Sequence, residues 1–179
     1  MANLYSNKKP VISIVSSVSN LGKTTLIEKI VKVLKNRGYK VGVIKHDAHQ
    51  FQIDYPGKDS YRFTEAGADN VVITSDNKVA MIKKIEKRES IEELLGLFQD
   101  VDIVIVEGFK ESAFPKIEVY RKSKDSHLLY RDFENNFTNF IAVAADEKMK
   151  LDIPVLDLNN ADEIADFIET NFMGETKRG

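Results

Sequence analysis

Short apolar runs alternate with amphipathic segments along most of the chain. The runs lie at Val11–Val15, Val41–Ile44, Val71–Ile73, Ile103–Val106, Phe140–Ala145 and Val155–Leu158. Runs of this length without polar interruption are typical of strands that are buried on both faces of a parallel sheet. The pattern therefore predicts an α/β fold with a mainly parallel, doubly wound sheet, in which ligand-binding loops follow the carboxyl ends of the strands.

Three of the intervals between these runs show helical periodicity. The first predicted helix has an apolar stripe along Leu26–Leu34 and ends before Gly38, a residue that favours helix termination. The second begins after Ser90, where Glu93 three residues later completes a capping box, and continues to position 98. The third covers residues 161–172, with its apolar residues on one side.

Three segments depart from this alternation. Residues 47–67 form a long predicted connection that is rich in His, Asp, Pro and Gly. Residues 115–121 alternate between polar and apolar, as an exposed or edge strand does. Residues 122–138 are polar and charged, which indicates a solvated loop or an interface hairpin. Long connections at strand ends often carry function, so residues 47–67 are of most interest.

Composition limits the class of protein. The chain has 179 residues, 42% of them hydrophobic, and we expect one domain over residues 10–173 between flexible tails at 1–9 and 174–179. A net charge of −2 gives no basic surplus, so neither nucleic acid nor an anionic membrane is an expected partner. The absence of cysteine excludes disulfides and thiolate chemistry. The first apolar run is too short for a signal peptide, so we expect a cytoplasmic protein.

The strongest chemical signal is the tripeptide Gly22-Lys23-Thr24, which falls between a predicted strand and a predicted helix. Loops in this position bind phosphate through backbone N–H groups and the helix N-terminus. Lys23 would neutralise the β- and γ-phosphate oxygens, and the Thr24 hydroxyl is placed to bind Mg²⁺. Ser17 replaces the usual first glycine of the motif, and Asn20 is acceptable because asparagine populates left-handed backbone more readily than most residues. The motif predicts a nucleoside triphosphate ligand.

Two acidic residues flank the apolar run Ile103–Val106. A strand rises about 3.3 Å per residue, so Asp102 and Glu107 would lie at opposite ends of this strand. Only Glu107 would then lie at the phosphate edge, where a carboxylate holds Mg²⁺ through water. Asp102 is interpreted as a turn or strand-entry residue.

The connection after the second predicted strand contains several candidate ligands. They are Lys45, His46, His49, Asp54, Lys58, Asp59 and Ser60. Asp54 is a candidate for γ-phosphate sensing or for water-mediated contact with Mg²⁺, because P-loop proteins place a switch segment here. The two imidazoles could bind a transition metal, orient an anion or transfer a proton. We expect an anion, because lysine and serine are poor metal ligands and two histidines are fewer donors than a stable site requires.

Several motifs in order along the chain resemble the MobB family of molybdopterin-guanine dinucleotide biosynthesis adaptor proteins. The motifs are Ser19–Leu26, Ile44-Lys45-His46, Asp54 with Pro56–Ser60, Ala66-Gly67-Ala68, Val106–Lys110 and Pro115-Lys116-Ile117. The resemblance implies a three-layer P-loop NTPase fold of the signal-recognition/MinD class, GTP binding and a homodimer. It also implies a role assisting the MobA-type guanylyltransferase, the enzyme that joins GMP to molybdenum-bound molybdopterin.

The resemblance also assigns roles to particular residues. Ser19, Asn20, Leu21, Gly22, Lys23, Thr24 and Thr25 would hold the triphosphate, and Thr24, Asp54 and Glu107 would surround Mg²⁺. Asp146 follows a late strand and is either a guanine-binding carboxylate, accepting N1–H and N2–H, or an ordinary turn residue. Whether the molybdopterin cofactor contacts this chain stays open.

The chain departs from the family pattern at Asn20, where glycine is common, and at Gln50, where a second histidine is frequent. No obvious general base is present in the sequence, which favours slow GTP hydrolysis at most. Two alternatives remain open: a small-molecule kinase with a lid containing arginines such as Arg121 and Arg131, and a metallochaperone GTPase that uses His46 and His49. A DNA-partitioning ATPase is disfavoured, because valine stands at position 18 where that group has a lysine.

Overall fold

The computed structural model describes residues 9–46, 51, 53–124, 127–132, 134 and 136–174. The chain divides into two compact units, one formed by Met1–His46 with Phe98–Gly179 and the other by Asp47–Leu97. We expected one domain over residues 10–173, and the second unit is an insertion within that span. Most residues of the two predicted tails lie outside the described residues. No helix in the described part of the chain is long and apolar enough to cross a membrane.

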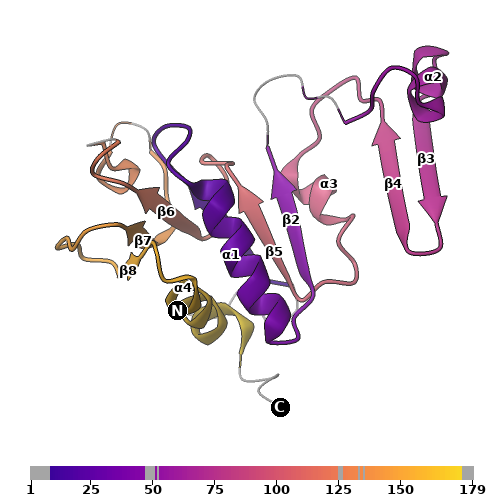
Figure 1. The fold of residues 1–179 in the computed structure, drawn as a ribbon. Helices are drawn as coiled ribbons and strands as arrows, with labels where there is room; N and C mark the ends of the chain where they lie inside the picture. The colour runs from indigo at the N-terminus through magenta and orange to yellow at the C-terminus, as the bar shows by residue number, and fades with distance from the viewer. Residues whose placement is uncertain are drawn as a thin grey trace. The chain divides into compact units, whose positions relative to one another are not determined.

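The first unit is built on a six-stranded sheet in the order β2-β5-β1-β6-β7-β8, and all its neighbouring strands are parallel (Figure 1). The strands are β1 (Val11–Val15), β2 (Val41–Lys45), β5 (Ile103–Glu107), β6 (Lys116–Tyr120), β7 (Phe140–Ala145) and β8 (Val155–Asp157). Because the strands are parallel, their carboxyl ends meet at one edge of the sheet. The predicted parallel sheet is confirmed.

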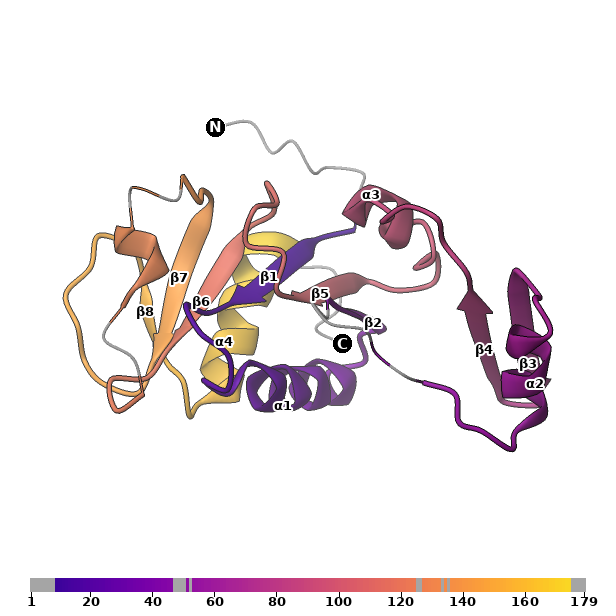
Figure 2. The same cartoon turned by 90° about the horizontal axis from the view of Figure 1, so that it is seen from above.

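Two helices cover one face of this sheet. They are α1 (Lys23–Asn36) and α4 (Ala161–Ile168), which lie side by side in Figures 1 and 2, and α4 continues into the π-helical turn η2 (Glu169–Met173). The stripe predicted for the first helix is buried at Leu26, Ile30 and Leu34. These side chains pack against apolar side chains of the strands in one core. Burying that surface stabilises the helix that begins at the phosphate motif.

The opposite face is covered near β6 and β7 by a short 3₁₀ helix, η1 (Leu129–Arg131). The prediction that residues 115–121 form an exposed or edge strand is wrong, because β6 lies between β1 and β7 and is buried throughout. Lys116 donates to the carbonyls of Ser112, Phe114 and Thr138, and Glu118 accepts from the backbone N–H groups of Leu129 and Tyr130. These partners let charged side chains occupy a buried strand. The described residues between 122 and 138 contain η1 and no strand, so they do not form the expected interface hairpin.

The second unit contains α2 (Asp59–Glu65), β3 (Asn70–Ser75), β4 (Lys78–Lys83) and α3 (Ile91–Leu95). The capping box of Ser90 and Glu93 is confirmed. Two expectations are wrong. Val71–Ile73 belongs to an antiparallel two-stranded sheet rather than to the parallel sheet, and the connection predicted over 47–67 contains α2. A run of three apolar residues did not distinguish a central strand from a hairpin strand.

Candidate functional site

The loop between β1 and α1 has the backbone expected of a phosphate-binding loop. Asn20 and Gly22 have φ angles of 63° and 101°, both in the left-handed region. Asn20 therefore adopts the left-handed conformation that the sequence predicted it would tolerate. Leu21 is buried and anchors the loop, whereas Ser19, Asn20, Thr24 and Thr25 are exposed. The polar residues of the loop are thus accessible to a ligand.

Lys23 is the first residue of α1 and directly follows Gly22 of this loop. Its Nζ donates to Ser16 Oγ over 2.8 Å, and Ser16 Oγ donates to the Val18 carbonyl over 2.6 Å. Burial lowers the pKa of Lys23, and the nearby Glu107 carboxylate opposes that shift. Lys110 and Lys45 lower it further through charge repulsion. A bound polyanion would relieve this concentration of positive charge.

Thr24 and Glu107 are in direct contact. The Thr24 hydroxyl lies 3.2 Å from Glu107 Oε1 and 3.1 Å from Oε2, so two of the predicted magnesium ligands are brought together (residues from α1 and β5). Asp102 lies at the other end of β5, where its Oδ2 accepts the Lys40 N–H over 2.7 Å. The assignment of Asp102 to strand entry is confirmed. A hydroxyl and a carboxylate are hard oxygen donors, which fits Mg²⁺.

The segment after β5 lies at the same edge of the sheet. Gly108 and Phe109 both have positive φ angles, of 92° and 55°, and such backbone is rare for a phenylalanine. The Phe109 ring packs against His46, with centroids 4.9 Å apart. The His46 N–H donates to the Glu107 carbonyl over 3.2 Å, and Lys45 pairs with Glu107 in the register of β2 and β5. His46 and Lys45 therefore lie at the predicted edge.

The other residues of the predicted anion loop belong to the second unit or are outside the described residues, as His49 is. Asp54 Oδ1 accepts from Ser60 Oγ over 2.9 Å, while Asp54 Oδ2 is buried without a hydrogen-bond partner among the described atoms. Lys58 precedes α2 as its N-cap, and Asp59 is the first residue of that helix. Because these residues lie in the second unit, their roles at the phosphate edge stay predictions.

A cation and a carboxylate from the ends of β6 and β7 complete the edge. Arg121 Nε donates to the Leu21 carbonyl over 3.0 Å, and its Nη1 lies 3.7 Å from Asp146 Oδ2. Arg121 was expected only as an arginine of a possible kinase lid, because residues 115–121 were predicted to form an exposed or edge strand. The position of Arg121 directly after a strand beside β1 was the signal that could have revealed it. No group of three His, Cys, Asp or Glu side chains among the described residues is arranged to hold a metal ion.

The parallel sheet, the loop after β1 and the Thr24–Glu107 contact define a P-loop NTPase fold. A family model described as "Molybdopterin guanine dinucleotide synthesis protein B" matches residues 11–146, and the chain belongs to this MobB family.

Two curated relatives are molybdopterin-guanine dinucleotide biosynthesis adapter proteins. The relative from Haemophilus influenzae is 38% identical over 165 residues, covering 91% of this chain and 89% of its own length. The relative from Escherichia coli is 34% identical over 154 residues, covering 84% and 86%. A crystal structure of molybdopterin-guanine biosynthesis protein B matches with a TM-score of 0.70 and 29% identity, covering 89% of this chain and 98% of that one. The resemblance seen in the sequence is therefore confirmed.

Proposed function

We propose that this protein is a GTP-binding adaptor of molybdopterin guanine dinucleotide biosynthesis that assists the guanylyltransferase of that pathway. The adapter names of its relatives support the pathway. The observation that carries the nucleotide part is the contact between Thr24 and Glu107, whose carboxylate lies near the Lys23 ammonium. The triphosphate would lie on the loop Ser19–Thr25, with Lys23 against the β- and γ-phosphates.

Magnesium would be held at this contact. Thr24 would bind the ion directly and Glu107 through water, and the ion would neutralise charge on the β- and γ-phosphates. Asp54, which belongs to the second unit, stays a predicted water-mediated contact of the ion. Because Glu107 is assigned to holding magnesium, we do not propose it as the general base that activates water for hydrolysis. We therefore propose slow hydrolysis at most.

A homodimer is also part of the proposal. The cross-strand pair Val72 and Met81 is 59% and 55% exposed, and Val79, two positions from Met81 on the same face, is 68% exposed. A two-stranded sheet is marginally stable alone, and its free edges invite further pairing. A cavity of about 1070 Å³ within the second unit is lined mainly by apolar side chains, including Phe51, Ile53 and Leu97. A second copy of this chain would cover these surfaces symmetrically.

The adaptor role is tested by a reconstituted reaction of the guanylyltransferase with GTP and molybdopterin. Addition of this protein should increase formation of the dinucleotide, and Lys23→Ala should remove most of the increase. A matched control is Lys29→Ala, which removes the same charge from an exposed position of α1. No effect of the wild-type protein on product formation would reject the adaptor role while leaving nucleotide binding to be measured separately.

A cytoplasmic location is also part of the proposal, because the GTP pool of the cell lies there.

A further inference from the structure

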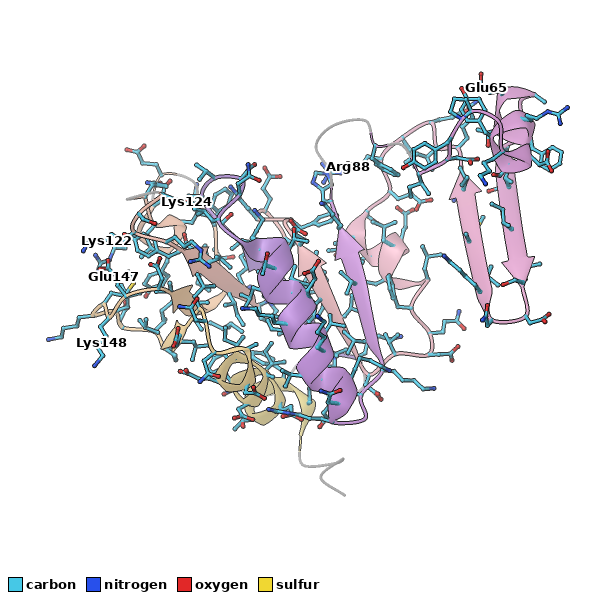
Figure 3. The ribbon with its side chains drawn as sticks, in the orientation of Figure 1. Glu65, Arg88, Lys122, Lys124, Glu147 and Lys148 are labelled. Carbon is cyan, nitrogen blue, oxygen red and sulfur yellow. The ribbon has the colours of Figure 1, made fainter. Side chains whose placement is uncertain are left out.

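Three cationic side chains hold backbone carbonyls of the phosphate loop. Lys110 Nζ donates to the Ser17 carbonyl over 3.0 Å, Lys124 Nζ donates to the Asn20 carbonyl over 3.2 Å, and Arg121 Nε donates to the Leu21 carbonyl over 3.0 Å. Lys110 follows β5, whereas Arg121 and Lys124 follow β6; Figure 3 labels Lys124. The segments that follow β5 and β6 thus hold three carbonyls of the loop in place.

Peptide geometry connects these contacts to ligand binding. In a planar trans peptide the C=O and the following N–H point in opposite directions. When Arg121 holds the Leu21 carbonyl outward, the Gly22 N–H is turned inward. Lys124 has the same effect on the Leu21 N–H by holding the carbonyl of Asn20. Inward N–H groups at the start of a helix are the donors that a phosphate requires.

Arg121 is the best supported of these braces. Its guanidinium lies against Gly22, where an added Cβ would be 3.6 Å from Nε and from Nη2. Its Nη1 faces Asp146 Oδ2, while Asp146 Oδ1 accepts the Lys122 N–H over 3.2 Å. The carboxylate is therefore fixed from two directions at the end of β7. A planar guanidinium can contact the carbonyl and the carboxylate together, which a lysine cannot do with the same geometry.

We propose that Arg121 is a positioning residue that holds the phosphate loop in its binding conformation, and that Asp146 orients Arg121 rather than reading the guanine base. The inference rests on the proposed function, since it assumes that a nucleotide binds this loop. It predicts that Arg121 and Asp146 affect binding of the phosphates whatever base is attached. A guanine-reading carboxylate would instead affect GTP alone.

The test measures binding of Mg-GTP, Mg-ATP and magnesium tripolyphosphate, which has no base, by calorimetry. Arg121→Gln should weaken all three by a similar factor of roughly tenfold, the size expected for a charge-assisted hydrogen bond. Asp146→Asn should also weaken all three alike, and the double variant should bind no more weakly than Arg121→Gln. Arg121→Lys should recover part of the loss. The matched control is Lys122→Gln, because the Lys122 side chain contacts Glu147 instead of the loop (Figure 3).

Two results would overturn the inference. One is a loss of GTP affinity in Asp146→Asn with ATP and tripolyphosphate unchanged, which would assign Asp146 to the guanine base. The other is unchanged affinity for every ligand in Arg121→Gln with a thermal midpoint equal to that of the wild type. If Arg121→Gln does not fold, Arg121→Lys and Asp146→Asn still decide between these outcomes. A wild-type protein that binds none of the three ligands would reject the proposed function itself.

Discussion

At the scale of single residues, the position of a carboxylate along β5 decides its task. Glu107 lies at the carboxyl end of the strand, against the Thr24 hydroxyl, whereas Asp102 lies at the other end and accepts a backbone N–H from Lys40. The two carboxylates at opposite ends of this strand therefore have different roles. Only a group at the phosphate edge is within reach of an ion on the triphosphate.

The first prediction compares these two carboxylates. Glu107→Gln should reduce by roughly tenfold the gain in GTP affinity that magnesium provides, because an amide is a poorer partner for a hydrated Mg²⁺ than a carboxylate. Asp102→Asn should leave that dependence nearly unchanged. Calorimetric titration of GTP over a range of magnesium concentrations measures both. Equal effects at the two positions would contradict the proposed magnesium site.

At the scale of elements, α1 is held to α4 by a charged network as well as by the core. Arg37, at the end of α1, contacts Glu169 and lies 2.8 Å from Asp166 and 3.4 Å from Asp162. Burial opposes the charge of Arg37, but the hydrogen bonds to Glu169 and Asp166 raise the pKa of the guanidinium. The network fixes the far end of the helix that begins at the phosphate loop.

The second prediction removes this network. Arg37→Ala should lower the free energy of unfolding by about 1–3 kcal/mol, because the mostly buried Glu169 carboxylate loses its cation while the partly exposed pairs contribute little. Lys35→Ala removes a charge from the same turn at an exposed position and should change stability by less than about 0.5 kcal/mol. Urea unfolding compares the two. A loss in Lys35→Ala as large as in Arg37→Ala would mean that general charge, and not the network, is responsible.

The third prediction concerns η1, which is held by the buried Glu118 carboxylate through the N–H groups of Leu129 and Tyr130, 2.7 Å and 2.9 Å away. Burial raises the pKa of Glu118 above its usual 4.5, despite these hydrogen bonds. The folded state then binds the proton more tightly than the unfolded state, so stability falls as pH rises from about 4.5 through the folded-state pKa.

Glu118→Gln removes this titration. The stability of the wild type minus that of Glu118→Gln should therefore decrease as pH rises from 4.5 and become constant above the folded-state pKa. Urea unfolding across this pH range measures the difference. A difference that increases with pH would show that the hydrogen bonds outweigh burial.

At the scale of the whole molecule, the chain combines a unit with the P-loop fold and a small inserted unit. The insertion, Asp47–Leu97, has a two-stranded sheet whose exposed face includes Val72, Val79 and Met81. Apolar surface of this kind is typical of an interface. The molecule therefore has one surface suited to a nucleotide and another suited to a protein.

The fourth prediction tests the dimer. Met81→Glu should convert the protein to a monomer, because a charge in the middle of an apolar interface is left without a partner. Lys78→Glu changes charge on the same strand but on its other face, and should leave the dimer intact. Sedimentation equilibrium measures both. A wild-type protein that is monomeric at concentrations of about 100 μM would contradict the dimer and point to another partner for this face.

Features set by neighbouring residues were predictable from the sequence, and features set by distant partners were not. The strand, phosphate loop and helix from Val11 to Asn36 follow from local pattern, as does the opposite placement of Asp102 and Glu107. β6 was predicted to be an exposed or edge strand because polar residues such as Lys116 alternate with apolar ones. The Lys116 ammonium is instead satisfied by carbonyls that include the distant Thr138.

The contact of Arg121 with Leu21 could not be predicted while β6 was placed at an edge. Both failures have the same physical origin, since the role of a charged side chain paired within the fold is recognisable only when its partners are known.

The central claim, that the loop before α1 binds Mg-GTP, is tested most directly by one calorimetric titration of the wild type and Lys23→Ala. The wild type should bind Mg-GTP, and Lys23→Ala should lower the affinity by at least roughly tenfold, because it loses a charge that faces the phosphates. The thermal midpoint without ligand should stay within a few degrees of the wild type, since among the described residues the Lys23 ammonium donates to the hydroxyl of Ser16. Equal affinity of the two proteins, with equal thermal midpoints, would contradict the claim.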